Sequence, residues 1–157
     1  SIYDATIKTG NEVLDIILTE KSLICQNKNI KFTCMADCSA LGFISDGELY
    51  ALFGNMFDNA IEAVSTISDP EERCIGLHIH GEGEFVSVMM ENYYAEKIRF
   101  GAGGMPITKK ADKNNHGFGL KSIRVIVEKY GGDISIVAED KVFRLSILLP
   151  KARSERK

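Results

Sequence analysis

The sequence predicts an α/β two-layer sandwich, in which a mixed, mostly antiparallel sheet carries helices on one face. Three observations lead to this fold class. Helical periodicity alternates with short strands, the later strands come in pairs around turn residues, and no apolar run reaches the ~20 residues of a membrane span. A chain of 157 residues that is 45% apolar is long enough for one domain with its own core.

The first half of the chain is predicted to hold two helices and one strand. The first helix spans about residues 11–25. Its apolar stripe is formed by Val13, Ile16, Ile17, Leu23 and Ile24. A strand follows at about residues 30–35. Ser45 and Glu48 then form a capping box, which predicts a long second helix that ends near Ile67, before an Asp-Pro pair.

The second half is predicted to form two strand pairs, separated by a long loop and a helix. The strands are expected at residues 75–80 and 86–92, around Gly81-Glu82-Gly83, and at residues 133–138 and 142–149. Residues 93–116 show no periodicity, and a loop of this length is expected to be disordered or to act as a lid. A helix follows at about residues 117–130 and is ended by two glycines.

Charge and cysteine usage argue against several classes of partner. A net charge of −3 gives no basis for binding nucleic acid or an anionic membrane surface. The polar start of the chain does not resemble a signal peptide, and the four cysteines lack Cys-x-x-Cys spacing, so reduced cytoplasmic thiols are expected. A zinc site made by Cys34, Cys38, His78 and His80 is a minor alternative, because structural zinc sites space their ligands differently.

The long second helix carries a polar stripe opposite its apolar face. The stripe consists of Glu48, Asn55, Asp58, Asn59, Glu62 and Thr66. Asn and Asp each cost up to ~0.7 kcal/mol relative to Ala inside a helix, yet three occur within this short stretch. Asn55 and Asn59 are i,i+4 neighbours, so their amides project side by side. Magnesium favours few protein oxygens together with water and substrate phosphates, so this stripe predicts a magnesium and phosphate site.

The start of the following helix is a second candidate element. It reads His116-Gly117-Phe118-Gly119-Leu120, and glycines there let backbone amides approach a phosphate at the positive end of the helix. The preceding glycine-rich segment contains Lys109, Lys110 and Lys113. We therefore interpret the two together as a phosphate-closing segment. P-loop, Rossmann and eukaryotic kinase motifs are not found in the sequence.

These motifs resemble those of the GHKL ATPases, the group that includes gyrase and the histidine kinases. Residues 55–63 resemble the N box of the group, and residues 116–120 resemble its second glycine box. Within the group, the chain is most similar to the Agr-type receptor kinases of peptide quorum sensing. Asp-Asn-Ala-Ile-Glu-Ala, a Thr-Lys before the lid end and His-Gly-x-Gly-Leu-Lys-Ser recur together there. Thr9-Gly10-Asn11 resembles the end of their dimerisation region, so the resemblance covers essentially the whole chain.

The resemblance implies a Bergerat fold that binds ATP with Mg²⁺ between the N-box helix and the lid. Asn59 would be the magnesium ligand, and Asn55 would lie beside the phosphates. Asp58 or Glu62 would polarise the nucleophile. The remaining cofactor-binding candidates are Lys109, Lys110, His116, Gly117, Phe118, Gly119 and Leu120.

The strand before the lid departs from the family pattern. The family reads adenine with the Asp of an Asp-x-Gly-x-Gly box, whereas strand alternation places Asn92 at that inward position, followed by Tyr93 and Tyr94. An Asn amide oxygen accepts a hydrogen bond from the adenine amino group, but it lacks the charge that roughly doubles the strength of such a bond. We therefore expect weak nucleotide affinity, in the high-micromolar range or worse.

The resemblance also implies the activity. The chain would be the catalytic domain of a two-component sensor histidine kinase, which transfers the γ-phosphate of ATP to a histidine on upstream dimerisation helices. None of the three histidines of this chain is placed like that acceptor. Residues 11–150 would form the catalytic domain, residues 1–10 the end of the dimerisation region or a linker, and residues 151–157 a basic tail.

The implied partners follow from this activity. They are the upstream helices, a cognate response regulator and a second copy within a homodimeric receptor in the membrane, with this domain in the cytoplasm and not itself touching the membrane. Three alternatives stay open. The chain would otherwise be a degenerate nucleotide-binding interaction module, a GHKL anti-sigma factor that phosphorylates serine, or an α/β binding domain outside the GHKL group.

Overall fold

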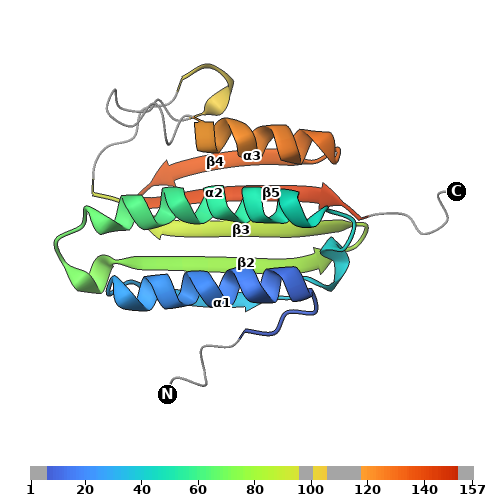
Figure 1. Ribbon diagram of the computed structural model, residues 1–157. Helices are drawn as coiled ribbons and strands as arrows, with labels where there is room; N and C mark the ends of the chain where they lie inside the picture. The colour runs from blue at the N-terminus through green and yellow to red at the C-terminus, as the bar shows by residue number, and fades with distance from the viewer. Residues whose placement is uncertain (1–6, 96–100, 106–117, 152–157) are drawn as a thin grey trace, which may run out of the picture.

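The computed structural model describes residues 7–95, 101–105 and 118–151, with the backbone alone for Ala102 and Phe118. These residues confirm the predicted two-layer α/β sandwich with a mixed sheet. Three α-helices lie side by side on one face of a five-stranded sheet, and α2 lies between α1 and α3 (Figure 1). The other face of the sheet is not covered by any described helix.

The elements follow the predicted order with small shifts at their ends. The helices are α1 (Glu12–Asn27), α2 (Asp46–Ser65) and α3 (Phe118–Lys129). The strands are β1 (Lys31–Ala36), β2 (Cys74–Glu82), β3 (Phe85–Tyr93), β4 (Asp133–Glu139) and β5 (Val142–Pro150). Short 3-10 helices occur at Ser39–Leu41, Pro70–Glu72 and Ala102–Gly104.

The sheet has the strand order β1-β2-β3-β5-β4. β1 pairs with β2 in parallel, and the other three pairs are antiparallel. The register aligns Leu77, Met90, Leu145 and Ile136 across four strands, and the first three of these side chains are buried under the helices. Since strand side chains alternate between faces, His78 falls on the uncovered face, as the sequence predicts.

Local sequence signals set the ends of several elements. Asn11 caps α1 by accepting a hydrogen bond from the Leu14 amide at 3.1 Å. Ser45 is the N-cap of α2. Asp140 and Lys141 both have positive φ, at 53° and 65°, which fits a two-residue turn that follows the twist of a hairpin.

Two sequence-based expectations are wrong in detail. On α1, Ile16 and Leu23 are 58% and 44% exposed, whereas Leu14, Leu18 and Cys25 are buried. The buried face is therefore rotated away from the predicted stripe, because contact with α2 and the sheet decides which of the apolar residues of α1 are covered. Gly81 and Glu82 belong to β2 and not to the turn, which lies at Gly83 and the residue after it.

α2 supplies much of the core. Its apolar side buries Leu49, Leu52, Phe53, Met56, Phe57, Ala60 and Val64. Phe57 packs edge-on against Phe32 of β1, with ring centroids 5.4 Å apart. Because one side of α2 is held by the sheet, its polar residues are confined to the opposite side and to the side that meets α3.

Candidate functional site

The amide pair of α2 meets the first turn of α3. A Cβ atom built on Gly119 would lie 3.5 Å from Asn55 Oδ1 and 3.6 Å from Asn59 Oδ1. Gly119 is buried, so the missing side chain leaves a small space between its backbone and the two carboxamide groups. The structure thus brings together three of the predicted site residues, from two helices that are far apart in the sequence.

The Asn59 side chain is incompletely satisfied. Its Nδ2 atom is buried and has no hydrogen-bond partner among the described residues. A buried polar atom without a partner is costly, and in native proteins it often marks a functional site. Amide oxygens that converge on a glycine at a helix start fit the oxygen ligands and the phosphate that magnesium prefers. Of this pair, Asn59 is the residue that the sequence analysis predicts to hold magnesium, with Asn55 beside the phosphates.

Asp58 and Glu62 flank this pair on α2. Both side chains are exposed. Asp58 directly precedes Asn59 in the chain, and Glu62 lies three residues after it, on an adjacent part of the helix surface. Their placement is compatible with a role toward a substrate that approaches from solvent, which stays a prediction.

Asn92 occupies the inward position that strand alternation predicts. It is 5% exposed, on the side of β3 that faces the helices. Its Nδ2 atom donates a hydrogen bond to the carbonyl oxygen of Tyr93 at 2.8 Å. This bond orients the carboxamide, and Oδ1 is its acceptor atom, which can receive a hydrogen bond from a ligand. Position 92 thus offers a neutral hydrogen-bond acceptor on the side of the sheet that faces the helices.

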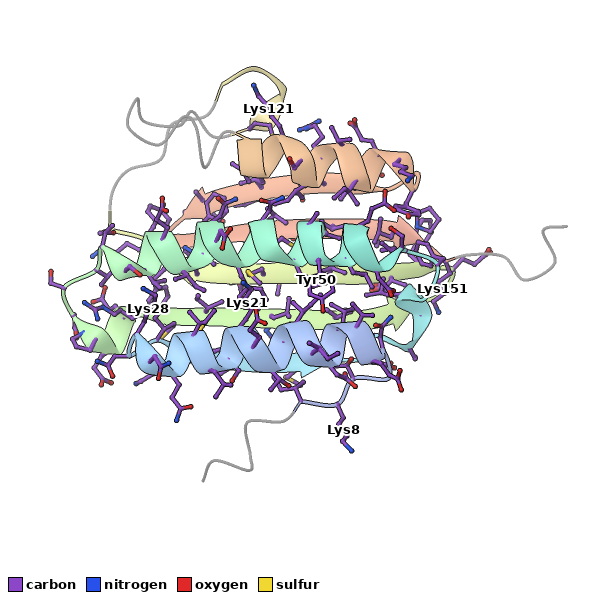
Figure 2. The ribbon with its side chains drawn as sticks, viewed as in Figure 1. Lys8, Lys21, Lys28, Tyr50, Lys121 and Lys151 are labelled. Carbon is purple, nitrogen blue, oxygen red and sulfur yellow. The ribbon has the colours of Figure 1, made fainter. Side chains whose placement is uncertain are left out.

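The other predicted site residues divide into two groups. Lys109, Lys110, His116 and Gly117 lie outside the described residues. Phe118 begins α3, and Leu120 is buried in the core, where its side chain packs instead of facing solvent. Figure 2 shows Lys121, also on the first turn of α3, projecting away from α2 and therefore away from the amide pair.

A contact that sequence analysis missed holds part of the predicted lid. Residues 101–105 form a tight turn in which the Gly101 amide donates to the Met105 carbonyl oxygen at 2.8 Å. Arg124 of α3 donates from its guanidinium to the Gly103 carbonyl oxygen at 3.1 Å. Met105 packs against the core. This turn is therefore fixed on α3, and no local sequence signal connects Arg124 with it.

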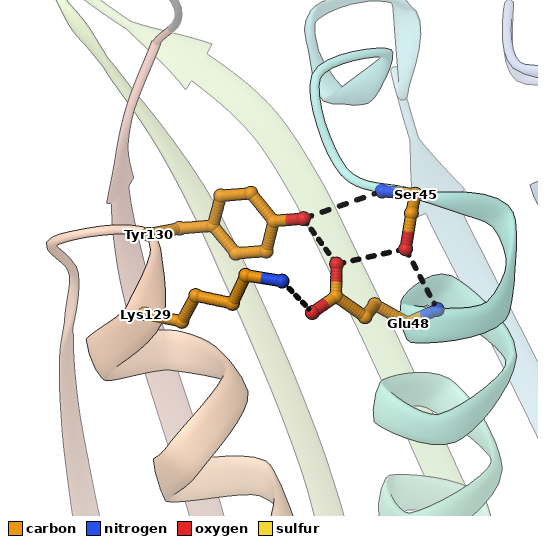
Figure 3. Close-up of polar contacts among 4 residues, drawn as sticks. All are labelled: Ser45, Glu48, Lys129 and Tyr130. Carbon is orange, nitrogen blue, oxygen red and sulfur yellow. Dashed lines mark hydrogen bonds and ion pairs between the residues drawn. The ribbon is translucent and has the colours of Figure 1, made fainter.

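The far end of the contact between α2 and α3 carries a second polar cluster, which we call the clip: Ser45, Glu48, Lys129 and Tyr130 (Figure 3). Lys129 Nζ lies 2.6 Å from Glu48 Oε2, and the Tyr130 hydroxyl donates to Glu48 Oε1. Ser45 Oγ also donates to Glu48 Oε1, at 2.7 Å. The donors Lys129, Tyr130 and Ser45, in that order of effect, lower the pKa of Glu48 to about 2.

The clip modifies the predicted capping box. In such a box the carboxylate at the third helical position accepts from the N-cap backbone amide. Here the Ser45 amide donates to the Tyr130 hydroxyl instead, at 3.4 Å, while the Glu48 carboxylate is bound by the end of α3. The Glu48 amide still donates to Ser45 Oγ, at 3.2 Å. Glu48 therefore links two helices instead of serving only the start of its own.

No group of three or more His, Cys, Asp or Glu side chains is arranged to hold a metal ion within the described residues. None of the helices in the described ranges has both the length and the apolar character that a membrane crossing needs.

The fold and the site together define a class of protein: a two-layer α/β domain in which two Asn side chains of the central helix face a glycine at the start of the next helix. Comparison with known proteins agrees with this class. Residues 46–150 match the family model described as "GHKL domain", so the chain belongs to the GHKL family. Comparison with curated proteins gave no match.

Solved structures with a similar fold include several histidine kinases. The nucleotide-free catalytic domain of histidine kinase ThkA is 18% identical and superposes with a TM-score of 0.66, over 92% of this chain and 94% of that one. The mycobacterial sensor histidine kinase MprB is also 18% identical, with a TM-score of 0.58 over 89% and 93%. Acinetobacter baumannii histidine kinase AdeS is 11% identical, with a TM-score of 0.60 over 90% and 64%. The chain therefore has the fold of these catalytic domains.

Proposed function

We propose that this chain is the ATP-binding catalytic domain of a sensor histidine kinase. The observation that carries the proposal is the pair Asn55 and Asn59, whose amide oxygens converge on Gly119 at the start of α3. Asn59 would be the magnesium ligand through its amide oxygen, since its unpartnered buried Nδ2 is a hydrogen-bond donor, and Asn55 would lie beside the phosphates. Bound Mg²⁺ would supply charge neutralisation for the triphosphate.

The residues of this chain would act mainly by positioning. Phosphoryl transfer from ATP is in-line and depends on alignment and electrostatics more than on covalent catalysis. The backbone amides at the start of α3 would bind phosphate oxygens, and Asn92 Oδ1 would accept from the adenine amino group. Asp58 or Glu62 would polarise the attacking histidine from the exposed side of α2. Lys109, Lys110, His116 and Gly117 would complete the phosphate site.

The phosphoacceptor would lie outside this chain. We propose that residues 11–150 form the catalytic domain, that residues 1–10 lead from dimerisation helices, and that residues 151–157 form a basic tail. The partners would be those helices, a response regulator and a second copy in a homodimeric receptor of the Agr quorum-sensing type. The domain would face the cytoplasm from a bacterial membrane receptor.

The test combines binding with transfer. The domain is titrated by NMR with a non-hydrolysable ATP analogue, with and without Mg²⁺, and transfer from labelled ATP to a separate fragment with the upstream helices is followed. The expected result is magnesium-dependent binding in the high-micromolar range or weaker, and transfer that is lost in Asn59→Ala. Asn27→Ala, at the exposed end of α1, is the matched control and retains both.

A second function is favoured by Asn92, which replaces a charged adenine-binding residue with a neutral one. The domain would then be a nucleotide-sensing interaction module. Binding of the analogue with no transfer to any upstream fragment supports this second function. Failure of the wild type to bind the analogue at NMR concentrations contradicts both.

A further inference from the structure

The C-terminal end of α3 is held by contacts with both α2 and the sheet. α3 contacts α2 and β4, and its apolar side is buried in the core. Just after α3, a Cβ on Gly132 would lie 2.5 Å from the Leu148 carbonyl oxygen, so the chain is pressed against β5 there. The clip then fastens the last turn of α3 to the first turn of α2, through Lys129 and Tyr130 (Figure 3).

The first turn of α3 is held differently. Around Gly119 the approach to α2 consists of van der Waals distances to Asn55 and Asn59. From Gly119 to Lys129 the helix rises ~15 Å. A tilt of ~10° about the clip would therefore move the start of α3 by ~2.6 Å. Hydrogen bonds to phosphate weaken over a few tenths of this distance.

We propose that Glu48, Lys129 and Tyr130 are positioning residues for the phosphate site. They hold the end of α3 against α2, so that the backbone amides at its start lie at the correct distance from the Asn55 and Asn59 amides. This inference rests on the proposed function. The clip residues would not touch the nucleotide, but they would raise its affinity by keeping the phosphate-binding amides of α3 in place.

The geometry makes the clip suitable for this role. Glu48 is only 22% exposed and is bound by three donors from two elements. The ring of Tyr130 is fixed in turn by an edge-on contact with Phe43, with centroids 5.6 Å apart. Bonds from several directions hold a carboxylate in one place, whereas a single exposed ion pair permits many arrangements.

The experiment removes the α3 side of the clip and leaves the cap of α2 intact. In Lys129→Met/Tyr130→Phe, Ser45 and Glu48 still cap α2, and the Phe43 contact is retained. The dissociation constants of adenosine and of the ATP analogue with Mg²⁺ are measured by NMR titration. We expect the dissociation constant of adenosine divided by that of the ATP analogue to fall about three- to tenfold, because ATP binds more weakly while adenosine affinity is unchanged. The conservative variant Lys129→Arg keeps the charge and should have a ratio close to that of the wild type.

The control is Lys31→Met, which removes a lysine–glutamate pair whose two side chains are both exposed, Lys31 with Glu71 at 2.9 Å, on the opposite edge of the sheet. It should leave the ratio unchanged. An unchanged ratio in the double variant overturns the positioning role, even if thermal stability falls. If the double variant does not fold, Tyr130→Phe alone decides. Lack of wild-type binding to the ATP analogue overturns the proposed function instead.

Discussion

The two ends of the contact between α2 and α3 differ in how fully their polar groups are hydrogen-bonded. At one end, two neutral amides face a glycine, and a buried nitrogen of Asn59 has no partner among the described residues. At the other end, Glu48 is bound by Lys129, Tyr130 and Ser45. The same pair of helices thus has one unsatisfied end and one that is densely hydrogen-bonded.

This difference between the two ends predicts that nucleotide binding depends mainly on one end of the contact and stability mainly on the other. A binding site for a charged ligand contains polar atoms that have no hydrogen-bond partner until the ligand binds, and these atoms lower the stability of the free protein. The clip holds α3 at the other end, where no ligand is needed. Changes at the amide end should therefore act on nucleotide binding with little loss of stability, and changes at the clip should act first on stability.

The largest effect is expected from Gly119→Ala. A Cβ at 3.5–3.6 Å from the amide oxygens is an ordinary contact, so the fold accommodates it, but it fills the space that a phosphate would use. We expect ATP affinity to fall about 10- to 100-fold. The free energy of unfolding should rise by up to ~1 kcal/mol, because Ala favours a helix over Gly. Calorimetric titration and denaturant unfolding check the two halves. A parallel loss of both would contradict the separation.

A smaller effect, in the opposite direction, is expected from Asn92→Asp. The substitution restores a charged acceptor for the adenine amino group, and ATP affinity should increase about five- to tenfold. It also removes the bond from Nδ2 to the Tyr93 carbonyl oxygen, so stability should fall by ~1 kcal/mol. The measurement is the same titration. Unchanged affinity would show that position 92 does not contact adenine.

Asn59→Ala tests whether the unpartnered amide nitrogen lowers the stability of the nucleotide-free protein. It removes a buried nitrogen without a partner and improves helix propensity, so the free energy of unfolding should rise by about 0.5–1 kcal/mol. Urea unfolding of the nucleotide-free domain measures this. Asn27→Ala gives the baseline for an exposed Asn at a helix end. A clear destabilisation by Asn59→Ala would mean that its amide stabilises the free fold.

The smallest effect concerns pH at the clip. The pKa of Glu48 is lowered from 4.5 to about 2, so its stabilising contribution is present above pH 4.5 and is lost as the pH falls toward 2. The thermal midpoint of Glu48→Gln should lie below that of the wild type near pH 7. The gap should close over this acidic window. A gap that is independent of pH would mean that the Glu48 charge contributes nothing.

Much of this molecule could be predicted from local patterns. The Ser45 cap, the inward direction of Asn92 and the side-by-side amides of Asn55 and Asn59 follow from helix and strand periodicity, and all are found. The polar stripe of α2 was predicted as one surface with one role. The structure divides it, since Glu48 binds the end of α3, Asn55 and Asn59 face its start, and Asp58 is exposed.

The sequence by itself determined the two-layer fold, the motifs and the identity of the polar atoms at the amide end, because periodicity and residue type are local properties. Only the tertiary structure decided which side of α1 is buried, that Arg124 holds the turn at Gly103, and that Glu48 meets Lys129. The last contact joins residues 81 positions apart in the chain. Such contacts depend on how helices pack on the sheet, and no window of neighbouring residues contains that information.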